Sequence, residues 1–424
     1  MKDKILTLFL CLFLATNAYA DCTAGANCAS YSVLLGGSPN DLNSGTTEYN
    51  YINSPGANTW TASETLRDFR MPFDGYVENL KVRVTTAPGE GNSFVFTVRE
   101  DAGATTLTCT ISGAVDTSCT DTTHSASVST GGLITIEVNP DDSPTVSNAY
   151  WSYVIRGSAG THVVSGMSKD GLYAGGGTYL PWVTSDQYDD TDEDDVGQII
   201  PTPGDMDDLY VQSLAAPGEG KSRTYYLREG KANSDTLYCA IADAAQSCSS
   251  ADEEDMDAGD LISLRQEPAG TPAGMASDWA TTWKPTTAGE YIWLGNSFTD
   301  TGATKYWTPA GGDCRESATE ADIAIPVYGV ELRDLFVRVE VAPGGEETTV
   351  ITVRDDGEDT ALSCTITGAE TSCNDTGETI SVAEDSLVSV SVVQSGGNGS
   401  ELSFGITNYI ADESGAAGRT RRFF

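Results

Sequence analysis

The stretch of sequence that decides the fold reads Leu80-Lys-Val-Arg-Val84, Ala87-Pro-Gly89, Thr97-Val-Arg99, Thr108-Cys-Thr-Ile-Ser-Gly113 and Thr117-Ser-Cys119. The same pattern returns twice, over residues 209–248 and 335–373. An internal repeat has to be recognised first, because it determines the architecture of the whole chain. The residues that recur are turn, strand and cysteine residues, so the repeat predicts a scaffold and not a catalytic set.

The length of the repeat predicts one domain per copy. Pro88, Pro217 and Pro343 occupy the same place in each copy, so the period is roughly 125–130 residues, far longer than a solenoid unit. The boundaries that we predict are a signal peptide at 1–20, β-sandwich repeats at 21–157, 158–286 and 287–412, and a basic-aromatic tail at 413–424.

The strand pattern predicts the fold class. Ile134-Thr-Ile-Glu-Val138 and Val388-Ser-Val-Ser-Val392 alternate between apolar and polar residues, which is typical of strands with one buried face. The recurring Pro-Gly, as at Pro88-Gly89, predicts a hairpin between two long strands. Helical periodicity is nearly absent. We therefore expect an all-β chain of three tandem antiparallel β-sandwiches, jelly-roll-like, each with an internal disulfide hairpin.

The cysteines repeat with the strands. In each copy two cysteines flank a short turn, and the predicted disulfides are Cys109–Cys119, Cys239–Cys248 and Cys364–Cys373. Cys22 and Cys28 are expected to close a fourth loop. Cys314 is left over, and an intersubunit bond, a free thiol and a buried unpaired cysteine all stay open for it.

The first twenty residues have the features of a signal peptide. Lys2 and Lys4 flank the start of the apolar run 5–14, and Ala18-Tyr-Ala20 matches the cleavage pattern. This run is too short to span a bilayer permanently, and no later stretch approaches the ~20 apolar residues that a membrane span needs. We expect a secreted protein, extracellular or at the cell surface, where disulfides persist.

Two kinds of recurring side chain have both a binding and a structural interpretation. Each repeated arginine ends a strand beside a carboxylate, and we interpret it as an outward residue that pairs with nearby carboxylates; the pairs of neighbours are Arg99 with Glu100, Arg228 with Glu229, and Arg354 with Asp355. Trp182 and Trp307, with Tyr51 at the matching place, are candidate glycan contacts, although their recurrence favours core packing.

The formal net charge of −39 excludes a nucleic-acid partner, because such a surface repels polyanions. The densest acidic run is 189–195, in which Asp189, Asp190, Asp192 and Asp194 are candidate Ca²⁺ ligands. The run does not complete an EF-hand pattern, so a solvated acidic loop is the favoured interpretation. The acidic run 252–257 has the same two interpretations.

The end of the chain inverts this charge. The tail residues are Arg419, Arg421, Arg422, Phe423 and Phe424. A disordered end is the default interpretation. The alternative is that the tail docks onto an acidic neighbouring subunit, a role to which arginine and aromatic side chains are suited.

Little in the sequence indicates catalysis. The two histidines, His124 and His162, belong to no visible triad or metal pattern, and no glycine-rich phosphate loop opens a helix. Carboxylate pairs for glycoside hydrolysis are too numerous to single out one. We therefore expect a protein that is not an enzyme and that has no cofactor, with Ca²⁺ as the one candidate ion.

The segment from Arg83 to His124 resembles a tandem disulfide-containing repeat of uncharacterised exported bacterial and phage structural proteins. The resemblance implies a β-sandwich or jelly-roll module of extracellular or virion-surface proteins, and it implies no activity. The second copy departs most, with Ala240-Ile-Ala-Asp243 in place of Thr-Ile-Ser-Gly. A signal peptide also argues against a virion component.

These observations favour an exported structural protein that self-associates as a subunit of an extracellular filament, sheath or surface layer. The alternative is an extracellular adhesin or an array of carbohydrate-binding modules that contacts extracellular polysaccharide through Trp182 and Trp307. A secreted hydrolase is the third hypothesis.

Overall fold

The computed structural model describes residues 30–38, 40–55, 59–158, 160–168, 171–187, 189–299, 304–312, 316–396 and 399–410. The fold is almost entirely β, with 63% of residues in strands and 2% in helix, as the sequence predicts. The strands form six sheets, which fall into three pairs along the chain. We name these pairs sandwich 1, sandwich 2 and sandwich 3.

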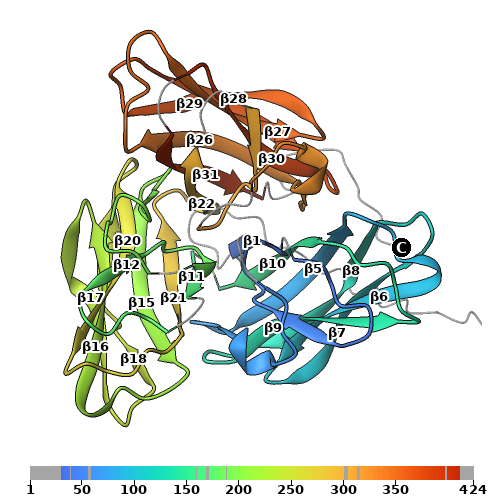
Figure 1. Cartoon of the computed structure of the whole chain (residues 1–424), viewed down its shortest axis with the longest axis horizontal. Coiled ribbons are helices and arrows are strands. Elements are labelled where there is room, and N and C mark those ends of the chain that lie inside the picture. The colour runs from blue at the N-terminus through green and yellow to red at the C-terminus, as the bar shows by residue number, and fades with distance from the viewer. Residues whose placement is uncertain are drawn as a thin grey trace, which may run out of the picture.

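Each sandwich has an inner sheet toward the centre of the molecule and an outer sheet (Figure 1). Sandwich 1 contains β1 (Ser30–Ser38), β2 (Glu48–Asn50), β3 (Ser54–Pro55), the 3₁₀ turn η1 (Glu64–Leu66), β4 (Phe69–Arg70), β5 (Gly75–Val84), β6 (Gly89–Glu100), β7 (Gly103–Gly113), β8 (Ser118–Val128), β9 (Leu133–Asp141) and β10 (Ala149–Gly157). Its inner sheet has the order β3-β1-β10-β5-β8, and its outer sheet has the order β2-β9-β6-β7 with β4 also paired to β9.

Sandwich 2 repeats this topology. Its elements are β11 (His162–Ser168), β12 (Thr178–Leu180), β13 (Ser185–Gln187), β14 (Gln198–Ile199), β15 (Gly204–Ser213), β16 (Gly218–Glu229), β17 (Ala232–Asp243), β18 (Ser247–Ser249), β19 (Glu253–Met256), β20 (Leu261–Ala269) and β21 (Ser277–Pro285). The inner order is β13-β11-β21-β15-β18, with β19 also paired to β15, and the outer order is β12-β20-β16-β17, with β14 paired to β20.

Sandwich 3 has this topology as well. Its elements are β22 (Glu290–Thr299), β23 (Thr304–Trp307), β24 (Glu316–Ser317), the 3₁₀ turn η2 (Glu320–Asp322), β25 (Ile325–Pro326), β26 (Val330–Val339), β27 (Thr348–Asp355), β28 (Glu358–Thr367), β29 (Ser372–Val382), β30 (Leu387–Gln394) and β31 (Ser400–Tyr409). The inner order is β22-β31-β26-β29, and the outer order is β24-β23-β30-β27-β28, with β25 paired to β30.

The registers of the inner sheets repeat with the sequence. Gly36 pairs with Trp151 across β1 and β10, and Gly166 pairs with Trp279 across β11 and β21. A Cβ atom on Gly36 would lie 2.0 Å from Trp151 Nε1, so the glycine leaves the space that the indole fills. The indole nitrogen in turn donates to the carbonyl oxygen of Ile52 at 2.9 Å. A buried aromatic side chain therefore fixes the same strand pair in successive sandwiches.

The three predicted disulfides are present, one in each sandwich: Cys109–Cys119, Cys239–Cys248 and Cys364–Cys373. The expected hairpin differs in one respect, since β7 pairs with β6 in the outer sheet and β8 pairs with β5 in the inner sheet. Each bond therefore connects the two sheets of its sandwich. Three disulfides are typical of proteins kept in an oxidising compartment outside the cytoplasm.

The prediction of a hairpin at Pro88-Gly89 is wrong. Residues 85–88 connect β5 in the inner sheet to β6 in the outer sheet, so this turn crosses between layers. The hairpin lies one connection later, between β6 and β7, where Glu100 pairs with Gly103. Asp101 and Ala102 form its two-residue turn with positive φ angles of 46° and 61°, as a tight hairpin turn requires.

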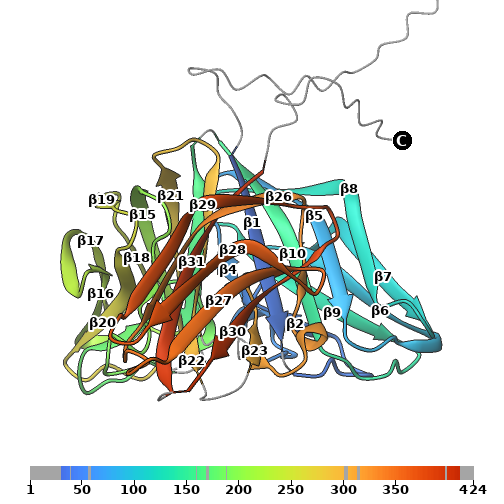
Figure 2. The ribbon, with the colours of Figure 1, turned by 90° about the horizontal axis from the view of Figure 1, so that it is seen from above.

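The three sandwiches surround a common centre, to which β1, β11 and β22 lie close (Figure 1). Seen at right angles, the strands run between the two ends of this ring (Figure 2). A single continuous hydrophobic cluster joins residues of all three sandwiches. No helix among the described residues is long and apolar enough to cross a membrane.

Candidate functional site

The candidate site of this molecule is the set of contacts that hold the three sandwiches together. A short strand of each outer sheet packs on the inner sheet of the next sandwich: β4 on β21, β14 on β31, and β25 on β10. The first sandwich contacts the second, the second contacts the third, and the third contacts the first. Head-to-tail contacts of this kind close into a ring when the rotation allows it. We call the three contacts seam 1–2, seam 2–3 and seam 3–1.

Seam 1–2 is built around Arg70 of β4. Its guanidinium donates to Gln212 Oε1 and lies 5.0 Å from the ring centroid of Tyr210, both on β15. Gln212 is paired in register with Asp278 of β21. Burial raises the pKa of Asp278 to about 7, while Arg70 opposes the rise and Asp68 adds to it. Burial also raises the pKa of Asp68 to about 6. This seam therefore holds two carboxyl groups that resist ionisation.

Seam 2–3 brings two backbones close together. A Cβ atom on Gly405 of β31 would lie 2.1 Å from the carbonyl oxygen of Ile199 in β14. The neighbouring Ser403 donates to the carbonyl oxygen of Gly197. Arg338 Nη2 lies 2.9 Å from Asp194 Oδ1 at the edge of the contact. The seam thus combines close backbone approach with one ion pair.

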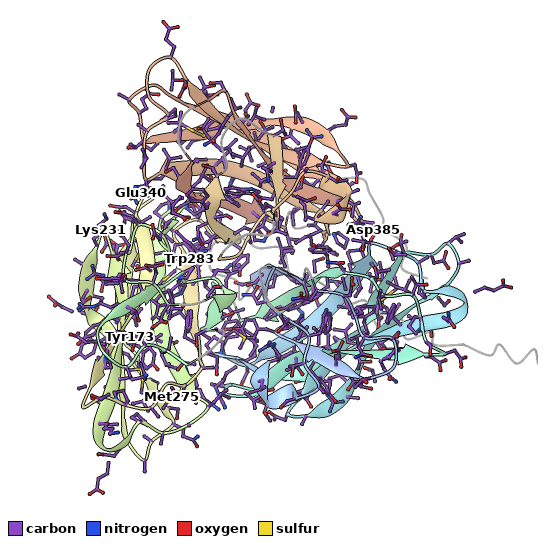
Figure 3. All side chains as sticks on the ribbon, in the orientation of Figure 1. Tyr173, Lys231, Met275, Trp283, Glu340 and Asp385 are labelled. Atoms are coloured by element: carbon purple, nitrogen blue, oxygen red, sulfur yellow. A yellow bond between two sulfur atoms is a disulfide. The ribbon has the colours of Figure 1, made fainter. Side chains whose placement is uncertain are left out.

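Seam 3–1 is ionic. The side chain of Lys81 on β5 is 1% exposed, and it pairs with Glu384 Oε1 at 3.2 Å and with Asp385. Asp385 lies where sandwich 3 meets sandwich 1 (Figure 3). Arg83, two residues along the same strand, donates to the carbonyl oxygen of Ala324 at 3.0 Å. No segment of the described chain links sandwich 3 directly to sandwich 1, and the side chains of Lys81 and Arg83 hold the two sandwiches together at this seam.

One position shows how the seams differ. Lys81, Tyr210 and Phe336 each follow the repeated leucine of their strand. Lys81 contacts Asp385, Tyr210 faces Arg70, and Phe336 lies 3.8 Å from the Cβ position of Gly259. The same place in the fold therefore carries an ionic, a cation–π and an apolar contact.

The centre of the ring joins all three sandwiches. Ser32, His162 and Tyr291 lie on the equivalent strands β1, β11 and β22. His162 Nδ1 and Ser32 Oγ are 3.1 Å apart, and the imidazole stacks on Tyr291 with ring centroids 5.6 Å apart. Tyr291 Oη donates to the carbonyl oxygen of Val163 at 2.8 Å. Burial lowers the pKa of His162 to about 3, so the imidazole is neutral near neutral pH.

The repeated arginines have a structural role in each sandwich. They pair with carboxylates as predicted, but the main partners are glutamates of the connecting segments and not the next residue in sequence. Two of these glutamates, Glu64 and Glu320, lie in the 3₁₀ turns η1 and η2. The contacts are Arg99 Nε to Glu64 at 2.7 Å, Arg228 Nη2 to Glu193 at 2.6 Å and Arg354 Nε to Glu320 at 2.9 Å. Each guanidinium also lies over a tyrosine ring: Arg99 over Tyr49, Arg228 over Tyr179 and Arg354 over Tyr306. Each arginine thus fastens a connecting segment to its outer sheet.

The candidate calcium residues are engaged with the protein. Asp189 Oδ2 accepts from the Tyr173 amide at 2.7 Å and from Thr178 Oγ1 at 2.6 Å, and Asp190 Oδ1 accepts from the Asp192 amide at 2.9 Å. Asp192 in turn accepts from the amide of Asp194.

Asp194 takes part in seam 2–3. Burial opposes its ionisation, but hydrogen bonds from Lys231 and Arg338 outweigh this effect and lower the pKa of Asp194. In the described part of the chain, no three His, Cys, Asp or Glu side chains are grouped to hold a metal ion.

The two candidate glycan contacts lie in the interior. Trp182 and Trp307 are both fully buried, and Trp182 Nε1 donates to Thr281 Oγ1 at 3.2 Å. An indole with no exposed face cannot stack on a sugar, so the structure does not support these two residues as contacts. The ladders also place Trp307 opposite Val390 and Leu180 opposite Leu264, so Leu180 and not Trp182 is the partner of Trp307 in the repeat.

Several predicted residues lie outside the described ranges. They are Cys22, Cys28, Cys314, Arg419, Arg421, Arg422, Phe423 and Phe424, together with the predicted signal peptide. The other histidine, His124, is half exposed, and its Nδ1 lies 2.9 Å from Asp121 Oδ2.

The seam contacts escaped prediction, because the sequence does not indicate which residues lie between sandwiches. It marks Asp194 only as a candidate calcium ligand, and Lys81 and Arg83 only as part of a repeated strand. A signal was nevertheless present: Lys81 interrupts a repeated strand at a place where the other copies have Tyr210 and Phe336. Residues that differ between copies of one scaffold mark places where the copies have different neighbours. No protein-family model matches the chain, and no curated protein matches it either.

Proposed function

We propose that this chain is a secreted, non-catalytic structural protein. Its three sandwiches form one rigid subunit of an extracellular filament, sheath or surface layer. The observation that carries the proposal is the closed ring with three chemically different seams. A ring of three identical chains would have identical seams. Here each seam is specific, so the order of the sandwiches is specified within a single chain.

The titratable groups of the described residues support a structural role. Asp68, Asp278 and His162 have strongly shifted pKa values, which in an enzyme often mark the active site. All three are packed in a seam or at the centre of the ring, and their shifts arise from burial. A surface hollow of about 340 Å³ is lined by Arg156, which already contacts Glu78 and the ring of Tyr76.

The ring also limits how copies of the chain can assemble. Because each seam surface is covered by another sandwich of the same chain, further copies have to contact the outer sheets or the ends of the ring. Disulfides between the two sheets of every sandwich suit a rigid subunit, since they resist separation of the two sheets.

Electron microscopy and light scattering test this proposal. The purified chain should form three-lobed particles that associate in a regular way as concentration rises, and the same particles should be found in the extracellular material of the producing cells. A chain that stays monomeric at every concentration and is absent from the extracellular fraction would contradict it.

A further inference from the structure

One row of residues distinguishes sandwich 2 from the other two. Tyr179 of β12 pairs with Arg265 of β20, Arg265 pairs with Tyr226 of β16, and Tyr226 pairs with Tyr238 of β17. The row crosses all four strands of the outer sheet, at the outer side of the ring (Figure 1). Because side chains directly opposite each other in a sheet share a face, the row forms one strip about 14 Å long.

The other sandwiches provide an internal comparison. The corresponding row is Tyr49, Glu137, Thr97 and Thr108 in sandwich 1, and Tyr306, Ser391, Thr352 and Ser363 in sandwich 3. The last two positions of these rows are joined by hydroxyl hydrogen bonds, at 3.1 Å in sandwich 1 and 2.8 Å in sandwich 3. The scaffold therefore folds with small hydroxyl residues where sandwich 2 has two tyrosines.

Of the two additional tyrosines, Tyr238 is exposed and Tyr226 is partly buried. The rings of Tyr226 and Tyr238 stack with centroids 5.4 Å apart and an interplanar angle of 24°. Tyr238 lies on the edge strand β17 and is 45% exposed, among the larger values for big apolar side chains of the described residues. A stacked aromatic pair at the surface that the scaffold does not need is typical of a binding surface.

The charges around the row restrict its ligand. Arg265 lies 3.5 Å from Glu267 and donates to Asn233 Oδ1, so its charge is balanced locally. Arg228, over the ring of Tyr179, is balanced by Glu193. The strip is thus nearly neutral on a chain of net charge −39, which repels nucleic acid and acidic polymers. Aromatic faces beside hydrogen-bonding groups suit the C–H faces and hydroxyl groups of a sugar.

We propose that the outer sheet of sandwich 2 binds a polysaccharide that carries no acidic groups, with Tyr238 and Tyr226 as the stacking residues and Arg265 and Asn233 as hydrogen-bond donors and acceptors. The proposal is independent of the structural role above, because it requires sandwich 2 alone to be accessible. It differs from the tryptophan hypothesis because its residues lie on the outer face of a single sandwich, whereas Trp182 and Trp307 are fully buried.

Affinity electrophoresis of the full chain tests the proposal. The probes are four neutral polymers, namely hydroxyethyl cellulose, laminarin, dextran and mannan, with alginate as the acidic control. At least one neutral polymer should retard the chain, and alginate should not. The double variant Tyr226→Thr/Tyr238→Thr installs the pair of sandwich 1, so it should fold, and it should weaken binding by tenfold or more.

The matched control removes the equivalent hydroxyl residue of sandwich 1, with Thr108→Ala, and should bind as the wild type does. Retardation by alginate alone, or no retardation by any neutral polymer, overturns the proposal. Unchanged binding by a folded Tyr226→Thr/Tyr238→Thr variant, with the wild-type melting temperature as the check of folding, overturns it as well.

Discussion

Lys81 Nζ lies 3.2 Å from Glu384 Oε1, although 303 positions separate the two residues in sequence. This contact closes seam 3–1, the one seam that joins the first and the last sandwich. The lysine is almost fully buried, whereas Glu384 and Asp385 remain partly exposed. The ring is therefore completed by an ionic contact that solvent reaches from one side.

The first prediction concerns this contact. Lys81→Ala should lower the free energy of unfolding by about 1–3 kcal/mol, because it removes charge-assisted hydrogen bonds while its partners keep access to water. The wild-type seam should also weaken with added salt, and the variant should lose that dependence. Urea unfolding at low and high salt measures both effects. Lys305→Ala, which disrupts a more exposed pair with Glu316, is the control and should cost less than about 1 kcal/mol. An equal loss of unfolding free energy in the two variants would show that the Lys81 contact stabilises the fold no more than an exposed ion pair does.

The second prediction concerns the carboxyl groups of seam 1–2. Asp278 titrates near 3.8 in the unfolded chain and has a pKa of about 7 in the folded chain. Between these values the folded chain holds the extra proton, so its stability is full below about pH 4 and falls as the pH rises to about 7. Asp68, with a folded pKa of about 6, acts in the same direction.

Asp278→Asn removes the cost of ionising a partly buried carboxyl group near Asp68 and Arg70. Its melting temperature should exceed that of the wild type at pH 8, by an amount equivalent to about 2–4 kcal/mol, and the two proteins should converge near pH 4. Thermal unfolding across this range is the measurement. Asp235→Asn, on the exposed side of β17, should leave the profile unchanged. A variant that melts below the wild type at pH 8 would mean that the ionised carboxylate is stabilised by Arg70.

The third prediction concerns His162 at the centre of the ring. Its pKa is 6.5 in the unfolded chain and about 3 in the folded chain, so the unfolded state takes up a proton first as the pH falls. The contribution of a neutral His162 is fully present above about pH 6.5 and is lost between about pH 6.5 and pH 3. His162→Phe retains a ring against Tyr291 and should flatten the loss of stability between pH 6.5 and pH 4. Denaturant titrations at several pH values measure this slope, and His124→Phe serves as the exposed control. The same slope in wild type and His162→Phe would assign the acid sensitivity to other groups.

Much of the fold could be predicted because its signals are local and repeated. Strand alternation and the spacing of Cys109 and Cys119 both depend on neighbours within about ten positions, and three copies of each signal reinforce one another. The turn at Pro88-Gly89 was predicted in the wrong topology, since a turn residue reports a change of direction but not whether the chain enters the same sheet or the opposite one. The cysteine spacing has the same limit, because it predicts the disulfide but not whether the bond joins strands of one sheet or of two sheets.

The seams could not be predicted because they depend on the placement of whole sandwiches. Arg70 meets Gln212 and Lys81 meets Asp385 across distances that no local pattern encodes. The glycan interpretation of Trp182 failed for a related reason: composition shows that an aromatic residue is present, and burial decides whether a ligand can reach it. The aromatic row of sandwich 2 became visible only when strand register placed Tyr226 opposite Tyr238.

The last prediction tests whether the backbone approach in seam 2–3 holds the ring together. Gly405 occupies the place that Ser152 and Ala280 have in the other sandwiches, opposite Leu294 in register. A methyl group at this position would lie 2.1 Å from a backbone oxygen, which cannot rotate away as a side chain can.

Gly405→Ala should therefore push β14 away from β31 and cost about 1–3 kcal/mol. Hydrogen exchange should increase at Gln198 and Ile199, while β16 and β17 of the outer sheet stay protected, because the strain is local to the seam. Gly45→Ala is the matched control, since the nearest atom to its Cβ is 4.0 Å away on the flexible side chain of Asn43. If both variants keep wild-type stability and exchange, the sandwiches tolerate separation at this seam, and the closed ring is not the rigid unit that the structural role requires.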